Sequence, residues 1–246
     1  MAIDEAIVAA RIADRVSNTL RFYCWAPSAV SVGRFQDLSD AVRVGDCCQH
    51  GVDIVRRISG GGTVYHDNHG EITYSVVAKE NDLGTADVVY AYNKICNGLI
   101  EAARNLGIDA NFSPGDQRNC PNLAVGGRKI SGSSQYHKGG VLLQHGTFLL
   151  DVDLEKMFTY LRVPWAQTIN DVVCVANEKI TSVKKELNRD VCVHEAFETL
   201  VNGFQKDLEM KLVEGPLTED EQQLASKLQE EKYSQDSWNL KGSARS

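Results

Sequence analysis

Apolar positions recur along the chain with two different spacings, and the two kinds of segment are interspersed. Alternating or short apolar runs, typical of β-strands, occupy residues 20–24, 29–32, 52–55, 72–77, 123–125, 128–133 and 141–152. Apolar residues at the spacing of one helix face occupy residues 1–16, 39–47, 86–106, 154–161, 194–208 and 218–232. Strands and helices mixed in this way predict an α/β (α+β) fold, without an internal repeat or a low-complexity linker.

The segment 86–106 carries the clearest helical pattern. Its apolar stripe is formed by Val89, Tyr92, Ile95, Cys96, Leu99, Ile100 and Ala103. Gly107 follows as a stop signal for this helix. Thr218 and Glu221 have the spacing of a capping box, which predicts that the last long helix begins there. Gly126-Gly127 separates two short apolar runs and predicts a β-hairpin.

Length and composition are those of one sizeable globular domain. The chain has 246 residues, 43% of them hydrophobic and 24% charged. We expect one domain over residues 1–240 and a disordered tail at 241–246. The net charge of −7 leaves no excess of Lys and Arg for phosphates, which argues against nucleic-acid binding. No apolar run reaches the roughly 20 residues that cross a bilayer, so no membrane segment is expected.

The cysteines indicate a reducing compartment. There are seven, an odd number, without a Cys-x-x-Cys pair or a disulfide framework. We therefore expect reduced thiols in a cytoplasmic protein, and no metal site built from cysteines. The first 13 residues include Asp4 and Glu5 and resemble an amphipathic helix rather than a signal peptide.

A glycine-rich stretch carries the first candidate chemistry. The three glycines at 60–62 separate two apolar runs, which predicts a turn between two β-strands. Without Cβ atoms, glycines let the backbone approach a ligand and direct several N–H groups at it. Arg56 and Arg57 could neutralise a carboxylate or a phosphate, and the His-Asp pair at 66–67 is expected on the same side. The alternative is a plain hairpin with two solvated arginines, but the flanking Arg-Arg and His-Asp favour a binding site.

Two further stretches carry candidate residues. Lys129 lies on an apparent strand within Gly-Arg-Lys-Ile-Ser-Gly-Ser at 127–133. A lysine beside exposed backbone donors could polarise a carbonyl or balance a phosphate, although a lone lysine next to a turn is usually only solvated. His145 lies within Leu-Gln-His-Gly-Thr-Phe-Leu-Leu at 143–150. Taken alone, such a histidine is more often structural than catalytic.

Together, and in this order, the three stretches closely resemble the biotin/lipoate ligase superfamily and, within it, the lipoate–protein ligase A family. The resemblance includes Met-Ala-Ile-Asp-Glu-Ala at 1–6, Leu-Arg-Phe-Tyr-x-Trp at 20–25, Val-Gly-x-Phe-Gln at 32–36 and Lys-Tyr-Ser-x-Asp-Ser-Trp-Asn at 232–239. It therefore covers nearly the whole chain.

The resemblance implies the catalytic domain of these ligases, with a large mixed β-sheet, a smaller sheet and flanking helices. It implies that lipoate is activated with ATP and Mg²⁺ to lipoyl-AMP and then transferred to a lysine of a lipoyl-domain protein. Lys129 would be the catalytic residue. By matching position, the acyl-adenylate would be bound by Arg57, Ser59, Gly60, Gly61, Gly62, Thr63, Val64, His66, Asp67, Lys129, Ser131, Gly132, His145 and Gly146.

The residue types suit this chemistry. Adenylation gathers negative charge on phosphate oxygens, which Lys129 and one arginine could stabilise more strongly in the transition state. The aliphatic acyl chain needs an apolar slot, to which Val76 and Leu149 could contribute. Amide formation needs a neutral acceptor lysine, so some group must accept its proton. The sequence does not name that group.

The chain departs from the ligase pattern in its length. Ligases of this branch usually carry a further small domain after the Lys-Tyr-Ser motif, and this sequence stops there. Because some members supply that domain as a separate polypeptide, a ligase with an accessory subunit is one alternative. The same length resembles the octanoyltransferases of the superfamily, which take octanoyl from acyl carrier protein through a cysteine thioester and without ATP.

Cys120 is the candidate nucleophile for the transferase alternative. It lies nine residues before Lys129, in a loop where one group of transferases has its reactive cysteine, although the spacing and the neighbouring residues differ. A nearby cation favours the thiolate, which is the nucleophilic form. Gly-Gly-Gly replaces the Gly-Gly-Arg of the transferase pattern, so the ligase is placed first and the transferase second. A carrier-binding module without chemistry is a third alternative, against which the intact Lys129 argues.

Overall fold

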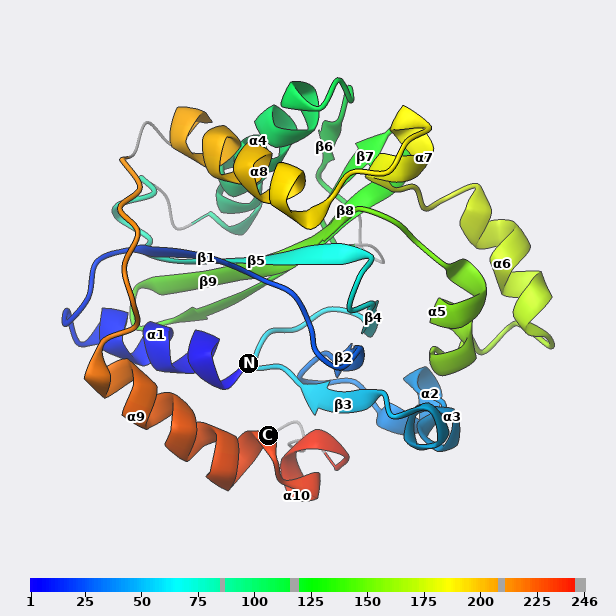
Figure 1. Ribbon diagram of the computed structural model, residues 1–246. Coiled ribbons are helices and arrows are strands. Elements are labelled where there is room, and N and C mark those ends of the chain that lie inside the picture. The colour runs from blue at the N-terminus through cyan, green and yellow to red at the C-terminus, as the bar shows by residue number, and fades with distance from the viewer. Residues whose placement is uncertain (85–86, 116–119, 208–210, 242–246) are drawn as a thin grey trace.

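The computed structural model describes residues 1–84, 87–115, 120–207 and 211–241 and contains two β-sheets with helices around them (Figure 1). The larger sheet is antiparallel, with the order β1-β5-β9-β8-β7-β6. Its strands are β1 Thr19–Tyr23, β5 Glu71–Lys79, β6 Asn111–Ser113, β7 Asn122–Val125, β8 Arg128–Lys138 and β9 Val141–Leu149. The smaller sheet has the order β3-β2-β4 and consists of β2 Ala29–Val32, β3 Asp53–Arg56 and β4 Val64–His66.

The expected α/β (α+β) fold with a larger and a smaller sheet is confirmed. One detail differs from the expectation: the mixed pairing lies in the smaller sheet. There β2 is parallel to β3 and antiparallel to β4, whereas each pair of neighbours in the larger sheet is antiparallel.

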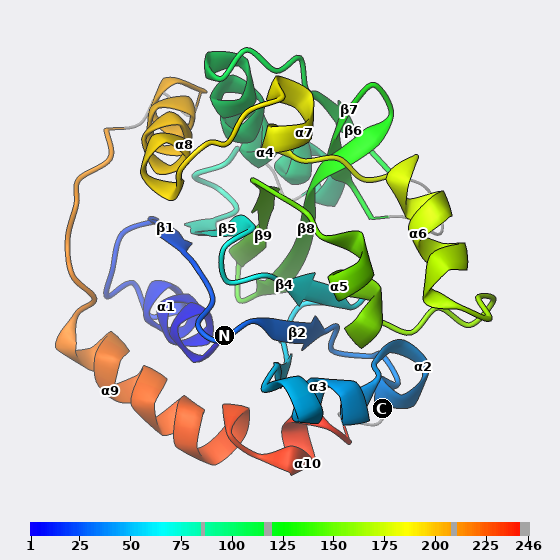
Figure 2. The same ribbon diagram turned by 45° about the vertical axis from the view of Figure 1, so that its right-hand side comes forward.

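Helices cover both faces of the larger sheet (Figures 1 and 2). α4 and α8 pack together over one face, and α1 and α9 pack together over the other. Side chains from α2, α3 and α5 complete the apolar cluster of the smaller sheet. The helices are α1 Ala2–Ile12, α2 Leu38–Ala41, α3 Val44–His50, α4 Val88–Asn105, α5 Leu154–Tyr160, α6 Ile169–Asn177, α7 Val183–Leu187, α8 Val193–Asp207, α9 Glu219–Leu228 and α10 Asp236–Asn239, with a π-helical turn Gln229–Tyr233 after α9.

The central strands β5 and β9 are buried along nearly their whole length because helices lie on both sides. On one side, Tyr74 belongs to the cluster that contains Leu99 of α4 and Phe204 of α8. On the other side, Val77 packs in a cluster with Ile7 of α1. Two covered faces explain why these segments are continuously apolar in the sequence rather than strictly alternating.

Several sequence predictions are confirmed at the level of single residues. The hairpin at Gly126-Gly127 joins β7 to β8, and both glycines have positive φ, 54° and 80°. The capping box forms as expected, because the Thr218 side chain accepts from the Glu221 N–H and the Glu221 side chain accepts from the Thr218 N–H. α9 begins directly after it.

Other predictions need correction. The glycine turn was expected between the apolar runs 52–55 and 72–77, but these lie in different sheets. β4, which the sequence analysis missed, follows the glycines and pairs with β2, and β5 then crosses to the larger sheet. α6 was also missed, and so were β6 and α7, which have only three and five residues. Of the predicted helix 86–106 and the predicted tail 241–246, residue 86 and residues 242–246 lie outside the described part of the chain.

The closing motif of the sequence holds the start of the glycine turn. Asn239 accepts a hydrogen bond from the Arg56 N–H (3.0 Å), and the Trp238 indole donates to the Arg56 carbonyl (2.8 Å). Lys232 and Tyr233 donate to the Glu5 carboxylate of α1 (2.7 and 2.6 Å). The first helix and the closing motif are therefore bonded directly to one another.

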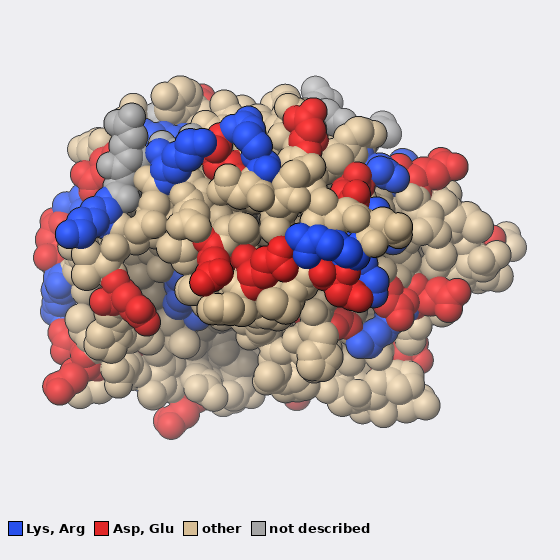
Figure 3. Space-filling model, turned by 45° about the horizontal axis from the view of Figure 1, so that its top comes forward, with Lys and Arg blue, Asp and Glu red and all other residues tan. Residues whose placement is uncertain are grey.

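Charged side chains of both signs are interspersed on the face shown in Figure 3. One of the ion pairs between α8 and α4 joins Lys206 to Glu101 (2.6 Å). Within the described residues, none of the helices is both long enough and apolar enough to cross a membrane.

Close packing of α4 and α8 gives the first prediction. A Cβ built on Gly203 would overlap the carbonyl oxygen of Gly98 and lie 2.7 Å from the backbone nitrogen of Ala102. Both are backbone atoms of α4, so the helices must separate to accept a side chain. We expect Gly203→Ala to lower the free energy of unfolding by about 3 kcal/mol in urea denaturation.

Gly45→Ala is the matched control. Gly45 lies in α3, and a Cβ there has no neighbour within 4 Å. The better helix propensity of Ala predicts a small gain, at most about 1 kcal/mol. A Gly203→Ala protein as stable as the unsubstituted one would contradict this description of the helix contact.

Candidate active site

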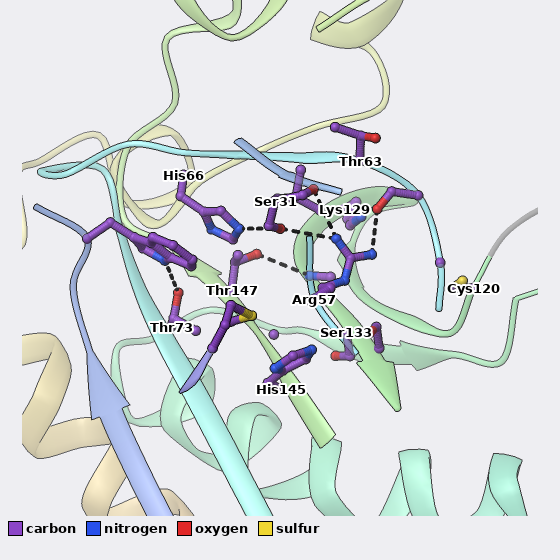
Figure 4. A pocket seen from close by; sticks show the side chains of 18 of the residues that line it. Ser31, Arg57, Thr63, His66, Thr73, Cys120, Lys129, Ser133, His145 and Thr147 are labelled. Atoms are coloured by element: carbon purple, nitrogen blue, oxygen red, sulfur yellow. Dashed lines mark hydrogen bonds between the residues drawn. The ribbon is translucent and has the colours of Figure 1, made fainter. Parts of the chain in front are cut away.

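One pocket lies where the smaller sheet meets the edge of β5, β8 and β9 (Figure 4). Its described lining comes from both sheets and from the glycine turn. The lining residues are Met1, Tyr23, Trp25, Ser31, Arg57, Gly61, Gly62, Thr63, Val64, His66, Thr73, Cys120, Lys129, Gly132, Ser133, Ser134, His145, Gly146 and Thr147. All three motifs of the sequence analysis therefore contribute to one cavity, and so does Cys120.

Most of the predicted site residues line this pocket. They are Arg57, Gly61, Gly62, Thr63, Val64, His66, Lys129, Gly132, His145 and Gly146. Four others are not among the lining residues. Ser59 and Ser131 are completely buried, and the Gly60 carbonyl accepts a hydrogen bond from Arg57 (2.8 Å). Val76 and Leu149, expected beside an acyl chain, are buried and are not among the lining residues either.

Asp67 points away from the pocket, contrary to the expected pairing with His66. Its carboxylate accepts from Lys156 (2.6 Å) and from the Tyr65 hydroxyl (3.1 Å), and it lies in a separate hollow beside α5. Consecutive residues at a strand end face opposite sides, so only His66 can face the pocket.

Arg57 is buried and bonded entirely by the protein itself. Its guanidinium donates to the Ser31 carbonyl and hydroxyl (3.0 and 3.1 Å), the Ser59 hydroxyl (3.2 Å), and the Gly60 and Gly62 carbonyls (2.8 and 2.6 Å). These five bonds match the five N–H donors of an arginine. Burial lowers the pKa of Arg57 to about 10, which still leaves it charged at neutral pH. Arg57 therefore supplies positive charge to the pocket without a spare donor.

Arg56 has a different task from its neighbour. Its guanidinium donates to the carbonyls of Gly33 (2.9 Å), Gln36 (2.8 Å) and Trp238 (3.1 Å). It is 1% exposed and is not part of the pocket lining. The idea that both arginines face an anion is therefore wrong for Arg56, which fastens the closing motif to the loop after β2.

The glycine turn lies beside both Cys120 and Arg57. Gly61 has φ of 84°, a conformation that other residues rarely adopt. A Cβ built there would lie 3.3 Å from a terminal nitrogen of Arg57 and 3.6 Å from the Cys120 sulfur. The missing side chain thus leaves room beside both the thiol and the guanidinium, and the thiol itself is exposed.

Lys129 is fixed at its backbone and free at its tip. Its N–H donates to the Lys179 carbonyl (2.8 Å), and its carbonyl accepts from the Thr181 N–H (2.9 Å). Its side chain lies over Gly132, where a Cβ would be 2.5 Å from the ammonium nitrogen. Desolvation lowers the pKa of Lys129 and Arg57 lowers it further, whereas a Cys120 thiolate raises it. Lysine, arginine and cysteine therefore interact electrostatically in one pocket.

His145 is held by a chain of oriented hydrogen bonds. The Ser134 hydroxyl donates to Ser59, and the Ser59 hydroxyl lies 2.6 Å from His145 Nε2. On the other side, His145 Nδ1 lies 3.1 Å from Asp4 Oδ2, and the other oxygen of Asp4 accepts from Arg21 and from Ser75 (2.8 Å). Burial lowers the pKa of His145, so its ring is neutral, with Nδ1–H donating to Asp4.

Several lining residues were not predicted from the sequence, notably Ser31 and Trp25. Ser31 stands in the buried strand β2, within Ala-Val-Ser-Val. A hydroxyl in an otherwise apolar run was the available signal, since a buried hydroxyl needs a partner. Trp25 belongs to a motif noted for its resemblance, but its ring stacks on His66 with centroids 4.2 Å apart, a contact that sequence does not reveal.

The donor set of the pocket is poor in hard oxygen ligands. Asp and Glu are absent from its described lining. The described chain also has no group of three or more His, Cys, Asp or Glu that could hold a metal ion. Carboxylate oxygens are the side-chain ligands that Mg²⁺ prefers, so the residues present fit a protein-held Mg²⁺ poorly.

Comparison with known proteins decides the family. The model of the lipoyl protein ligase A/B catalytic domain matches residues 1–205. The chain belongs to this family. Among its relatives in the family, an octanoyltransferase LipM from Symbiobacterium thermophilum is 39% identical, over 98% of this chain and 93% of its own. Seven further bacterial octanoyltransferases LipM are 31–35% identical over 98% of this chain.

Solved structures of lipoate–protein ligases share the family fold. One belongs to an archaeal lipoylation system of Thermoplasma acidophilum, described as a bi-partite lipoate protein ligase and its E2 lipoyl domain. It matches with a TM-score of 0.85 and 28% identity, over 100% of this chain and 92% of its own. A lipoate–protein ligase A bound with ATP matches with a TM-score of 0.83 and 28% identity, over 97% and 92%. The expected resemblance is confirmed, and the family includes both kinds of enzyme.

The Asp4 network gives the second prediction. Burial would raise the pKa of Asp4, but Arg21 and the hydrogen bond from His145 hold it well below its usual range. Asp4→Asn leaves Arg21 without its charge partner, and we expect a loss of about 3–5 kcal/mol of unfolding free energy at pH 7.

The sign of the pH dependence follows from the lowered pKa. The contribution of the Asp4 carboxylate to the free energy of unfolding is complete above the pKa of Asp4 in the unfolded protein, about 4. It is lost as pH falls through the lower pKa of the folded protein. The difference between Asp4→Asn and the unsubstituted protein should therefore shrink below about pH 4 in urea denaturation. The exposed Asp109→Asn is the control, and a pH-independent difference would contradict the account.

Proposed function

We propose that the protein is an octanoyltransferase that moves an octanoyl group from acyl carrier protein to a lysine of a lipoyl domain through a thioester on Cys120. The observation that carries the proposal is the position of the Cys120 thiol in the same pocket as Lys129 and Arg57. The octanoyltransferase names of relatives that are 31–39% identical support it. This reverses the order of the sequence analysis, which placed the ligase first.

The first half-reaction exchanges one thioester for another. The Cys120 sulfur attacks the carbonyl carbon of octanoyl-carrier protein, a carbon–sulfur bond to Cys120 forms, and the bond to the carrier sulfur breaks. The proton of the Cys120 thiol leaves on the carrier thiol, so atoms and charge balance. ATP is not needed, because the thioester already supplies an activated acyl group.

Two cations suit this step. Thiolates are the reactive form of cysteine, and nearby positive charge stabilises them. Lys129 carries its ammonium on a flexible side chain over Gly132, and Arg57 is a charge whose donors are already used. The Lys129 ammonium can therefore donate a hydrogen bond to the oxyanion that develops on the acyl carbonyl. Arg57 stabilises the same negative charge only through its own positive charge.

An ATP-dependent lipoate ligase is the second candidate. It is favoured by the 0.83 TM-score to a lipoate–protein ligase A bound with ATP and by the Gly-Gly-Gly turn. In that case Arg57, Gly61, Gly62, Thr63, Val64, His66, Gly132, His145 and Gly146 would bind lipoyl-AMP, with an accessory subunit as a further partner. The five occupied donors of Arg57 count against it, because none is left for the phosphate of lipoyl-AMP.

The third prediction separates the two candidates by their donors. An apo lipoyl domain is incubated with the protein and either octanoyl-carrier protein alone or lipoate with Mg-ATP, and its intact mass is measured. We expect an octanoyl adduct with the carrier alone and none for Cys120→Ser. A lipoyl adduct that needs ATP and survives Cys120→Ser would establish the ligase instead. Cys174→Ser, an exposed cysteine outside the described pocket lining, is the control.

The fourth prediction concerns the place of the lysine tip. A Cβ at Gly132 would meet only the mobile end of the Lys129 side chain, so the fold should tolerate Gly132→Ala while the ammonium is displaced. We expect octanoyl transfer to slow by roughly 100-fold with little change in unfolding free energy, as removing one electrostatic donor does elsewhere. Unchanged transfer kinetics in Gly132→Ala would show that the position of the Lys129 ammonium does not matter for octanoyl transfer. Gly45→Ala is the control for the substitution of a glycine outside the pocket.

A further inference from the structure

We propose that Ser31 and His66 form a proton relay that accepts the proton of the incoming lysine in the amide-forming half-reaction, with Glu71 holding the imidazole. The inference rests on the proposed function and supplies a group that it leaves unnamed. Ser31 and His66 both line the pocket that contains Cys120 and Lys129. Neither residue takes part in the thioester exchange described above.

The three side chains form a continuous hydrogen-bonded line. The Ser31 hydroxyl lies 2.8 Å from His66 Nε2, and His66 Nδ1 lies 2.7 Å from Glu71 Oε1. All three are buried, with exposures of 2%, 5% and 1%. This is the order of hydroxyl, imidazole and carboxylate in which a hydroxyl passes a proton to a ring that a carboxylate orients.

The neighbouring bonds fix the direction of the line. Thr73 donates to Glu71 Oε1 (2.9 Å) and accepts from the Trp25 indole (2.8 Å), so the carboxylate is an acceptor on both sides. His66 must then carry its hydrogen on Nδ1, which leaves Nε2 as an acceptor for the Ser31 hydroxyl. The Arg57 guanidinium donates to the same hydroxyl oxygen, so that oxygen already receives one bond as it gives one.

Arg57 places the relay beside the thiol. One terminal nitrogen of its guanidinium donates to Ser31 at 3.1 Å, and the other lies next to Gly61, against which Cys120 packs. Figure 4 shows Arg57 with Ser31 on one side and Cys120 on the other. A lysine that attacks a thioester on Cys120 therefore enters the same pocket that the Ser31 hydroxyl lines.

A second set of serine, histidine and carboxylate is hydrogen-bonded in the same order, but its serine does not reach the pocket. His145 also lies between a serine and a carboxylate, namely Ser59 and Asp4. Ser59 is completely buried, accepts from both Arg57 and Ser134, and is not among the lining residues of the pocket. Ser59 is therefore closed to a substrate, although His145 and Ser134 of its line border the pocket, whereas the Ser31 hydroxyl itself opens on the pocket.

The proton balance of the second half-reaction needs such a group. The ammonium of the acceptor lysine passes one proton to the Ser31 oxygen as the Ser31 hydroxyl proton moves to His66 Nε2. The neutral amine attacks the thioester carbonyl, the carbon–nitrogen bond forms and the bond to the Cys120 sulfur breaks. The second nitrogen-bound proton leaves on the Cys120 thiol. His66 is left as an imidazolium paired with Glu71 and returns its proton to solvent.

The surroundings of the His66 ring suit the positive charge that it carries after accepting the proton. Trp25 stacks on His66 with an interplanar angle of 18° and centroids 4.2 Å apart. An aromatic face stabilises a cation lying over it, and the Glu71 carboxylate compensates its charge. Lys129 does not replace the relay, because an ammonium has donors but no acceptor for the proton of the incoming lysine.

The test separates the two nucleophiles that can remove the acyl group. The octanoyl enzyme is prepared from octanoyl-carrier protein, freed of carrier by gel filtration, and mixed with saturating apo lipoyl domain or with hydroxylamine. Loss of the octanoyl group is followed by intact mass. Hydroxylamine is already neutral at pH 7 and needs no proton acceptor before attack, whereas the lysine ammonium does.

We expect His66→Gln to form the octanoyl enzyme and to release it to hydroxylamine as the unsubstituted protein does. Its transfer to the lipoyl domain should be roughly 100-fold slower, the usual scale for general base catalysis. Ser31→Ala, which removes a single hydroxyl, should show the same split and keeps the test decisive if His66→Gln is unstable. The control is His137→Gln, since His137 lies outside the described lining and is likewise bonded to a glutamate, Glu80 (2.7 Å), and to Gln135 (2.9 Å).

The outcomes are distinct. Equal slowing of both chases in both variants would show a structural role and overturn the relay. Normal transfer to the lipoyl domain in both variants would overturn it as well, while leaving the transferase intact. Failure of the unsubstituted protein to form any octanoyl enzyme would overturn the proposed function, and the relay with it.

Discussion

The buried guanidinium of Arg57 is the contact on which the site depends. It is 4% exposed and bonds the backbone of β2, both ends of the glycine turn and the Ser59 hydroxyl of the His145 line. Removing a charged group from water is costly unless all its donors are satisfied, and here each has a partner. The same five bonds set the shape of the glycine turn, and with it the space that Cys120 occupies. A change at this one residue would therefore move the turn, the thiol and both histidine lines together.

The opening and closing motifs of the sequence stabilise this arrangement through hydrogen bonds to residues of the site or next to it. Asp4 near the start of α1 orients His145, and Glu5, one residue later, binds Lys232 and Tyr233. The closing motif in turn bonds Arg56 and thereby fixes the residue before Arg57. The closing motif thus acts on the pocket through the backbone of Arg56, whereas the opening motif acts through the Asp4 side chain on His145 and also lines the pocket with Met1. Their distance from the chemistry in sequence does not reflect their distance in space.

The sequence predicted which residues gather at the pocket better than it predicted which of them line it and which support it. Lys129, His145 and the glycine turn were identified from local residue patterns and resemblance, and Cys120 from its position before Lys129. Arg56 and Arg57 could not be distinguished from the sequence. Both are buried, and which of the two lines the pocket depends on the path of the chain between β3 and the glycine turn. Asp67 was misplaced because the end of β4 was not predicted. Ser31 and Glu71 come from strands of different sheets, so their meeting at His66 depends on tertiary packing, which a single sequence does not specify.

Family membership narrows the chemistry without choosing between thioester and adenylate, since the relatives include octanoyltransferases and the structural neighbours are lipoate ligases. The choice rests on whether the acyl group is ever bonded to Cys120. The most direct measurement is rapid quenching of a single turnover with octanoyl-carrier protein in acid, followed by proteolysis and peptide mapping of the acylated residue. The account predicts a transient octanoyl thioester on the Cys120 peptide, formed before any product and without ATP. Product formation with no acylated cysteine at any time would contradict it.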